Sequence, residues 1–343
     1  MNNFSLHGRQ MGFSALLLGF GLALSPVAAR AADATAPAAK PPLVAQAPIA
    51  VAGGKGRFDL LEVDAKRYRL LVPHGGNAAL SVFDSESGKL IKEIPTGGAN
   101  GVAIDDVDGK YFVGAGDGNQ VAVVDAQTLT VTNTIPTTGP PDAMAFDPKT
   151  GTVYAGHDDG TEVWVIDAKT EKIVKSIAIP EGPEYVQYDP KTDLVYQNIK
   201  TADRVDVIDP KTQSVVAHLA TAPMQSPHGL AVDFESGHLF DAGANGKLVE
   251  IDLASGKVIA SADIAQRVDQ IAFDAGTKRI YCASGGGMLS VVQETATGLQ
   301  SLGDVPTARG CHSVTVDPNT HAVWVAYGGA DGGYIMKLVA PTQ

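Results

Sequence analysis

Seven polar residues recur along the 343-residue chain at intervals of 41 to 44 residues, and their side chains are the ones best suited to do chemistry. They are Asp59, Asn100, Asp142, Glu184, His228, Asp269 and His312. Carboxylates and imidazoles that converge on one point can bind a cation, a metal ion or a polar ligand. The competing interpretation is that Asp, Asn and His only cap backbone NH groups where a loop enters a strand. Both interpretations stay open, because the residue type differs from repeat to repeat.

Each of these residues lies five positions before an aspartate that ends an apolar segment. The seven aspartates are Asp64, Asp105, Asp147, Asp189, Asp233, Asp274 and Asp317. The third repeat is the clearest, with strand-like segments at 142–147, 153–157, 163–167 and 173–180. A period of about 40 to 45 residues with four short strands is typical of a β-propeller blade. The sequence therefore predicts an all-β, seven-bladed β-propeller with four-stranded blades.

The last repeat is one strand short, since it offers strand-like segments only at 312–317, 322–327 and 334–339. A blade without its outer strand would expose a sheet edge, which folded proteins avoid. The segment at 43–51 precedes the first repeat and has the β-character of the missing strand. We therefore expect residues 43–343 to form a single propeller, closed by an N-terminal strand in its last blade.

In a propeller the first strand of each blade lines the central channel, so the seven polar residues should surround one mouth of that channel. Two and four residues further on, every first strand is apolar, as in Leu61 and Val63. This pattern predicts that the polar character ends just below the mouth. The candidates for a metal site are Asp142, Glu184, His228, Asp269 and His312.

Four more residues are expected on the same face and are further ligand-binding candidates. His74 and His157 end the second strands of blades one and three. Arg57 and Arg309 lie in or beside inter-blade loops and would suit a ligand carboxylate or phosphate. Three other histidines, which are expected in a fourth strand or on the opposite turns, are assigned no role. They are His218, His238 and His321.

The second strands carry a family resemblance. Tyr154–His157, Tyr196–Ile199 and Tyr281–Ser284 are each followed by a Val-Ile-Asp-like strand, and they resemble the YVTN-type repeat family. A seven-bladed chain of this size is most similar to the periplasmic YncE-like propellers within that family. The resemblance covers about residue 43 to the C-terminus. It implies the propeller fold, but propellers of related type include lactone hydrolases and lyases, surface-layer proteins and electron-transfer subunits.

The leading hypothesis is a non-catalytic binding propeller whose top face and channel mouth take a small ligand or a partner protein. The rival is a metal-assisted lactonase or lyase with its site at the same mouth, where a bound cation would polarise a carbonyl. No catalytic residue is assigned. No cofactor is predicted beyond the divalent cation that the rival requires, and a monomer is expected.

Cys282 and Cys311 are the only cysteines. One ends the second strand of blade six and the other immediately precedes the first strand of blade seven, so both are expected between these blades. In an oxidising compartment the sequence predicts a disulfide between them. The alternative is a soft-metal site in which Cys311 joins His312 and Asp269.

The N-terminus predicts export. A basic start, a short apolar run and a small-residue cleavage pattern that ends at Ala31 mark residues 1–31 as a signal peptide, followed by an Ala/Pro-rich linker at 32–42. The protein is therefore expected in the periplasm or outside the cell, with no membrane span. The full chain carries a net charge of −12, and cleavage would leave −14. The YncE-like resemblance also implies single-stranded DNA as a candidate ligand. The negative charge and an aromatic content of 6% make nucleic acid an unsuitable partner for this chain.

Overall fold

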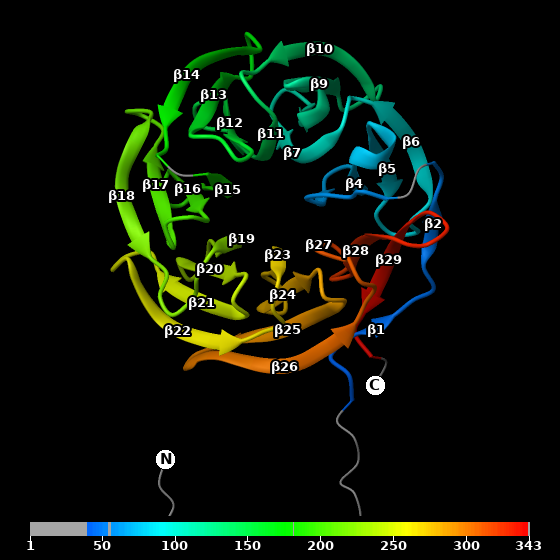
Figure 1. Ribbon diagram of the computed structural model, residues 1–343, viewed down its shortest axis with the longest axis vertical. Helices are drawn as coiled ribbons and strands as arrows, with labels where there is room; N and C mark the ends of the chain where they lie inside the picture. Colours follow the sequence, from blue (N-terminus) through cyan, green and yellow to red (C-terminus); the bar gives the residue numbers. More distant parts are fainter. Residues whose placement is uncertain (1–39, 54–55, 181, 342–343) are drawn as a thin grey trace, which may run out of the picture. The chain divides into compact units, whose positions relative to one another are not determined.

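Seven antiparallel β-sheets follow one another around a ring in the computed structural model (Figure 1). The structure describes residues 40–53, 56–180 and 182–341. The predicted signal peptide (residues 1–31) and most of the predicted linker (residues 32–42) lie outside these ranges. Within them, no helix has the length and apolar character needed to cross a membrane.

Each blade is built from consecutive strands, and the first strand of each blade is the innermost. The strands of blades one to three are β3 (Glu62–Asp64), β4 (Arg69–His74), β5 (Ala79–Asp84), β6 (Leu90–Pro95), β7 (Ala99–Asp105), β8 (Lys110–Ala115), β9 (Gln120–Asp125), β10 (Thr130–Pro136), β11 (Pro141–Asp147), β12 (Thr152–His157), β13 (Glu162–Asp167) and β14 (Lys172–Ala178). Those of blades four to six are β15 (Pro183–Asp189), β16 (Leu194–Ile199), β17 (Arg204–Asp209), β18 (Ser214–Ala220), β19 (Pro227–Asp233), β20 (His238–Gly243), β21 (Lys247–Asp252), β22 (Lys257–Asp263), β23 (Val268–Asp274), β24 (Arg279–Ser284), β25 (Met288–Thr295) and β26 (Gly298–Pro306). Two short 3₁₀ turns, η1 (Gly75–Asn77) and η2 (Gly116–Gly118), link the second and third strands of blades one and two. The predicted seven-bladed, four-stranded architecture is confirmed.

Blade seven closes the ring with segments from both ends of the propeller. Its own strands are β27 (Ser313–Val316), β28 (Val323–Gly328) and β29 (Gly333–Val339). The outer position is filled by β1 (Val44–Ala45) and β2 (Ile49–Val51), which both pair antiparallel with β29. Figure 1 shows these blue segments against the red strand. The predicted N-terminal closing strand is confirmed, although it is interrupted between β1 and β2.

The core lies between neighbouring blades, because side chains alternate across each strand and every sheet is covered on both faces. The aspartates that end the first strands are buried beneath the turns that follow them. Asp147, for example, is 1% exposed and accepts a hydrogen bond from the backbone NH of Lys149 at 2.8 Å. Some of these aspartates also join blades: the Tyr111 hydroxyl of blade two donates to Asp64 of blade one at 2.5 Å. The repeated aspartate is thus a structural device for turn and blade packing.

Candidate functional site

The channel mouth holds a small acidic cavity of about 160 Å³. Its lining residues are Asp59, Leu60, Asp142, Asp158, Glu184, Tyr185, His228 and Asp269. Most of them lie at or just before the start of an innermost strand, so the ring geometry alone brings together residues that are far apart in sequence. Five of the seven residues predicted to form the mouth therefore do meet at one site.

Three of these side chains come close enough to bind one ion. Glu184, His228 and Asp269 each offer a ligand atom, and the three atoms lie within 4.8 Å of one another. His228 Nδ1 lies 2.7 Å from the carbonyl oxygen of Ser226. If Nδ1 carries the proton and donates to this carbonyl, Nε2 keeps a free lone pair, which is the form of histidine that binds metals.

His312 joins the site through Asp269 rather than by lining the cavity. Its Nδ1 lies 2.7 Å from Asp269 Oδ2, and the two side chains are 32% and 34% exposed. Hydrogen bonding to Asp269 raises the pKa of His312. Burial opposes ionisation of Asp269, but the hydrogen bond from His312, together with the charges of His312, His228 and Lys200, lowers the pKa of this carboxyl. Each partner therefore favours the charged form of the other.

Three other carboxyl groups at the mouth, those of Asp59, Asp142 and Glu184, resist ionisation. Burial and then the neighbouring Asp269 charge raise the pKa of Asp59 to about 7. Burial, followed by the charges of Asp59 and Glu184, raises the pKa of Asp142 well above its usual range. Burial also raises the pKa of Glu184, although Lys200 opposes the shift. Like charges crowded in a poorly solvated cavity produce this pattern, and a cation placed among them would reverse it.

Sequence analysis missed two charged residues of the site, Asp158 and Lys200. Asp158 lines the cavity. Lys200 Nζ contacts Asp159 Oδ1 at 2.8 Å and also forms an ion pair with Glu184. Both directly follow the second strand of their blade, where the other five blades have Gly75, Gly116, Ala244, Gly285 and Gly329. Two adjacent blades thus carry a charged residue where the other five carry Gly or Ala. This difference is visible in the sequence and could have pointed to both residues.

Asn100 has a structural role that differs from both interpretations. Its side chain is buried at 7% exposure, and its Nδ2 donates to the carbonyl oxygen of Pro141 at 3.1 Å. It therefore joins blade two to blade three and does not line the cavity. For the five predicted residues that line the cavity, the binding and capping interpretations both stay open.

None of the four further candidates is among the described residues that line the cavity, although the charge of Arg57 acts on the nearby Asp59. His74 is fully buried and stacks on Phe58, with ring centroids 4.4 Å apart, and burial lowers its pKa. His157 stacks on Trp164 at 4.8 Å. Arg57 forms an exposed ion pair with Asp117 at 3.5 Å, and Arg309 is exposed in the loop before blade seven.

Below the mouth the channel wall is mixed: apolar residues such as Leu61, Leu230 and Ile271 line it, as predicted, together with polar residues that the prediction missed. A second cavity of about 420 Å³ includes Glu62, Tyr185, Gln187 and Gln270 among its lining residues. These polar residues lie one and three positions beyond the mouth residues. The prediction missed them because it considered only alternate positions of each first strand, and side chains alternate across a strand. Within this channel the Tyr185 hydroxyl donates to Glu62 at 3.1 Å, and burial raises the pKa of Glu62 to about 7.

Cys282 and Cys311 are free and buried in this structure, so the predicted disulfide is not formed. Cys282 packs in the core between blades five and six, with Phe240 and Ile271. Cys311 packs between blades six and seven, with Tyr281 and Val314. The two thiols therefore lie on opposite faces of the blade-six sheet, because Cys282 and its neighbour Tyr281 point to opposite sides of β24. Burial raises the pKa of Cys311 to about 11 and also raises that of Cys282.

Thiol titration tests this placement. We expect two reactive thiols per chain after denaturation without reductant, and almost none in the native protein, where both side chains are 0% exposed and un-ionised. The matched comparison is the same titration after reduction, which should give the same count. A denatured, unreduced protein with no titratable thiol would contradict the structure and restore the disulfide.

Comparisons with known proteins identify the fold and go no further. No family model and no curated protein matches the sequence. Among solved structures, the chain is similar to a protein of Kuenenia stuttgartiensis hydrazine synthase, at 16% identity and a TM-score of 0.72, over 85% of this chain and 97% of that one. It is also similar to U3-55K, at 12% identity and a TM-score of 0.73, over 85% and 98% of the two chains. The WD40 repeats of RRP9 match at 13% identity and a TM-score of 0.73, over 87% and 100%.

At such low identities the similarity shows the fold alone. The chain is therefore a seven-bladed β-propeller of WD40-like architecture.

Proposed function

We propose that this chain is a secreted or periplasmic, non-catalytic binding propeller that captures a small, positively charged ligand at the channel mouth. The observation that supports this most directly is the convergence of five carboxylates from four blades on one cavity of about 160 Å³. Burial and mutual repulsion raise the pKa of Asp142 at this site. A bound cation would relieve that repulsion, so the free energy of the site favours a cationic ligand.

We further propose that the chain belongs with the YVTN-type, YncE-like propellers. The support is the repeated second-strand pattern, which forms β12, β16 and β24. The predicted signal peptide at residues 1–31 supports export.

A metal-assisted lactonase or lyase remains the second candidate, and one observation favours it. Glu184, His228 and Asp269 present one nitrogen and two oxygen ligands within 4.8 Å of one another. Three protein ligands leave coordination positions open for a substrate carbonyl or water, as in catalytic metal sites. In this version the cation is the cofactor rather than the ligand.

The test is calorimetric titration of the full chain with MnCl2 and, separately, with 1,4-diaminobutane. The variant Asp142→Asn/Glu184→Gln keeps side-chain size while removing two charges, and we expect it to weaken binding of either probe at least about tenfold. Because the pKa of Asp59 is about 7, binding should also weaken as the pH falls below 7. The control Glu86→Gln/Asp108→Asn removes the same charge from exposed positions outside the cavity and should leave binding unchanged.

One variant checks the electrostatics of the site, and one activity assay separates the candidates. Lys200→Met removes the cation that pairs with Glu184, so it should tighten Mn2+ binding. Metal-dependent hydrolysis of a lactone panel, abolished in the double variant, would favour the enzyme. If neither probe binds to the unaltered chain, both candidates are contradicted. The ring would then have only a capping role.

A further inference from the structure

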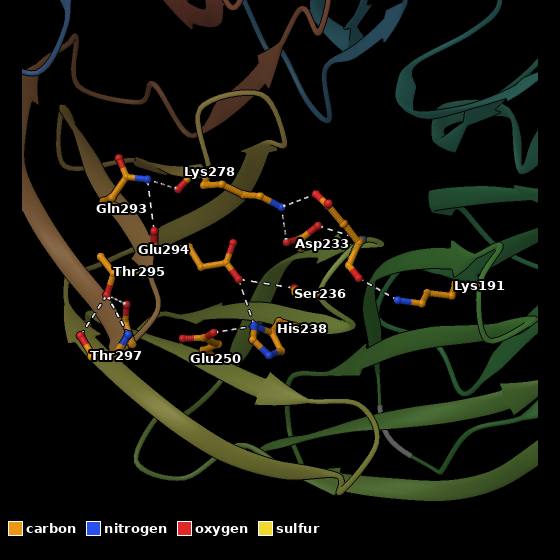
Figure 2. Close-up of polar contacts among 12 residues, drawn as sticks. Lys191, Asp233, Ser236, His238, Glu250, Lys278, Gln293, Glu294, Thr295 and Thr297 are labelled. Atoms are coloured by element: carbon orange, nitrogen blue, oxygen red, sulfur yellow. Dashed lines mark hydrogen bonds and ion pairs between the residues drawn. The ribbon is translucent and has the colours of Figure 1, made fainter.

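A second ligand-like cluster lies between blades five and six, at the opposite ends of the strands from the channel mouth. Figure 2 shows His238 of β20 between two glutamates, Glu250 of β21 and Glu294 of β25. His238 Nδ1 lies 2.7 Å from Glu250 Oε1 and 3.0 Å from Glu294 Oε1. The three side chains line a cavity of about 530 Å³, which also includes Ser236 and Lys278.

Glu250 occupies a position that the repeat pattern reserves for an apolar residue. At the same place in the third strand, the other blades that share this segment carry Val82, Val123, Val165, Val207 and Val291. Glu250 is only 1% exposed, and burial raises its pKa while the nearby His238 lowers it. A buried carboxyl in place of valine costs folding free energy, so its presence indicates a use other than packing.

Each glutamate also keeps an unsatisfied oxygen. Glu250 Oε2 and Glu294 Oε2 are both buried, and neither has a hydrogen-bond partner among the described residues. The side chains are 2% and 9% exposed. Buried carboxylate oxygens are normally satisfied, so these two point to a ligand that accepts their lone pairs.

We propose that His238, Glu250 and Glu294 form a site for a divalent transition-metal ion of the Zn2+ type. One imidazole nitrogen and carboxylate oxygens suit such an ion, whereas Ca2+ and Mg2+ prefer oxygen alone. The ligand atoms of tetrahedral Zn2+ lie about 3.3 Å apart, so the observed 2.7 Å and 3.0 Å need only a small outward movement. Three protein ligands beside a cavity leave at least one position open for water or an exogenous ligand.

Lys278 does not occupy the place of the ion. Its Nζ contacts Asp233 Oδ2 at 2.8 Å and Glu235 Oε2 at 3.1 Å, so its charge is compensated by other carboxylates. The competing explanation of the cluster is an imidazolium of His238 that pairs with both glutamates. That explanation leaves the two Oε2 atoms unsatisfied, whereas a metal ion bound by both oxygens of each carboxylate would use them.

The experiment is equilibrium dialysis of the chelator-treated full chain against ZnCl2, carried out in the Asp142→Asn/Glu184→Gln background so that the channel mouth does not contribute. We expect one Zn2+ per chain, and a loss of affinity of at least about 100-fold in both Glu250→Gln and His238→Gln. The matched control is His321→Gln, because His321 also contacts a buried carboxyl, Asp274, at 2.9 Å, but in a pair rather than a triad. This control should bind Zn2+ normally.

Co2+ substitution gives a second readout, since the intensity of its visible absorption reports four-coordinate binding and should vanish in the same variants. If Glu250→Gln fails to fold, His238→Gln decides alone, because the His238 side chain is 27% exposed and begins its strand. Absence of Zn2+ binding, or equal binding in the variants and the parent, would overturn the proposal. Either result would leave the proposed function at the channel mouth untouched, because the two sites share no residue.

Discussion

A chain that begins at Gly53 should lose most of its stability, by more than about 5 kcal/mol, because β29 would lose both of its outer partners. The loss also removes Leu43, which is 2% exposed and packs in the core between blades six and seven. Thermal unfolding of the full and shortened chains measures the difference.

Two point variants sharpen this prediction. Leu43→Ala should cost about 2 to 4 kcal/mol, as large-to-small substitutions in a core do. The neighbouring Val44 is 44% exposed, so Val44→Ala should cost less than about 0.5 kcal/mol. An unchanged melting temperature in the shortened chain, or equal effects of the two variants, would show that the closing segment does not carry the stability of blade seven.

The protein should be most stable at mildly acidic pH and should lose stability as the pH rises to 8. Burial raises the pKa of Glu62 from 4.5 to about 7 in the folded channel. A group with a raised folded pKa contributes its full stability below its unfolded pKa, and this contribution is lost as the pH rises through the folded pKa. At about 1.36 kcal/mol per pKa unit, Glu62 alone costs roughly 3 kcal/mol between pH 4.5 and pH 8.

Glu62→Gln keeps a neutral partner for the Tyr185 hydroxyl and should flatten this decline. Urea unfolding at pH 5 and pH 8 gives the two free energies, with Glu86→Gln at an exposed position as the control. A decline of the same size in Glu62→Gln would contradict the assignment. Below pH 4 the opposite trend should appear, because hydrogen bonds in the turns lower the pKa values of Asp125 and Asp167, and their stabilising effect is lost on protonation.

The repeat period fixes the number of blades and the depth at which each first strand begins, so the channel mouth could be predicted from sequence. Asp142 and Glu184 meet there because equivalent positions of a closed ring must meet. The Glu250 cluster could not be predicted in the same way, because His238 and Glu294 are not equivalent positions and only the packing of blade five on blade six brings them together. The sequence contains one indication of this cluster, which is that Glu250 stands where the third strands of five other blades have valine.

The cysteine prediction failed for a related physical reason. The sequence places Cys282 and Cys311 near the same pair of blades, but it does not state toward which face of β24 each side chain points. A shift of one residue along a strand reverses that face. Predictions about which blade a residue belongs to were therefore more secure than predictions about which neighbouring blade its side chain contacts.

The pairing of Ile49 with Ile335 also governs how the protein can fold. The segment that completes the ring is synthesised first, yet its partner strand is synthesised almost last. Until β29 is available, β1 and β2 present unpaired strand edges. The contacts that close the ring join segments at opposite ends of the propeller sequence, so the chain between them must form a very long loop before they can form. A chain that is delayed at this stage is open to association, and two such chains can exchange their 43–51 segments to form a domain-swapped dimer.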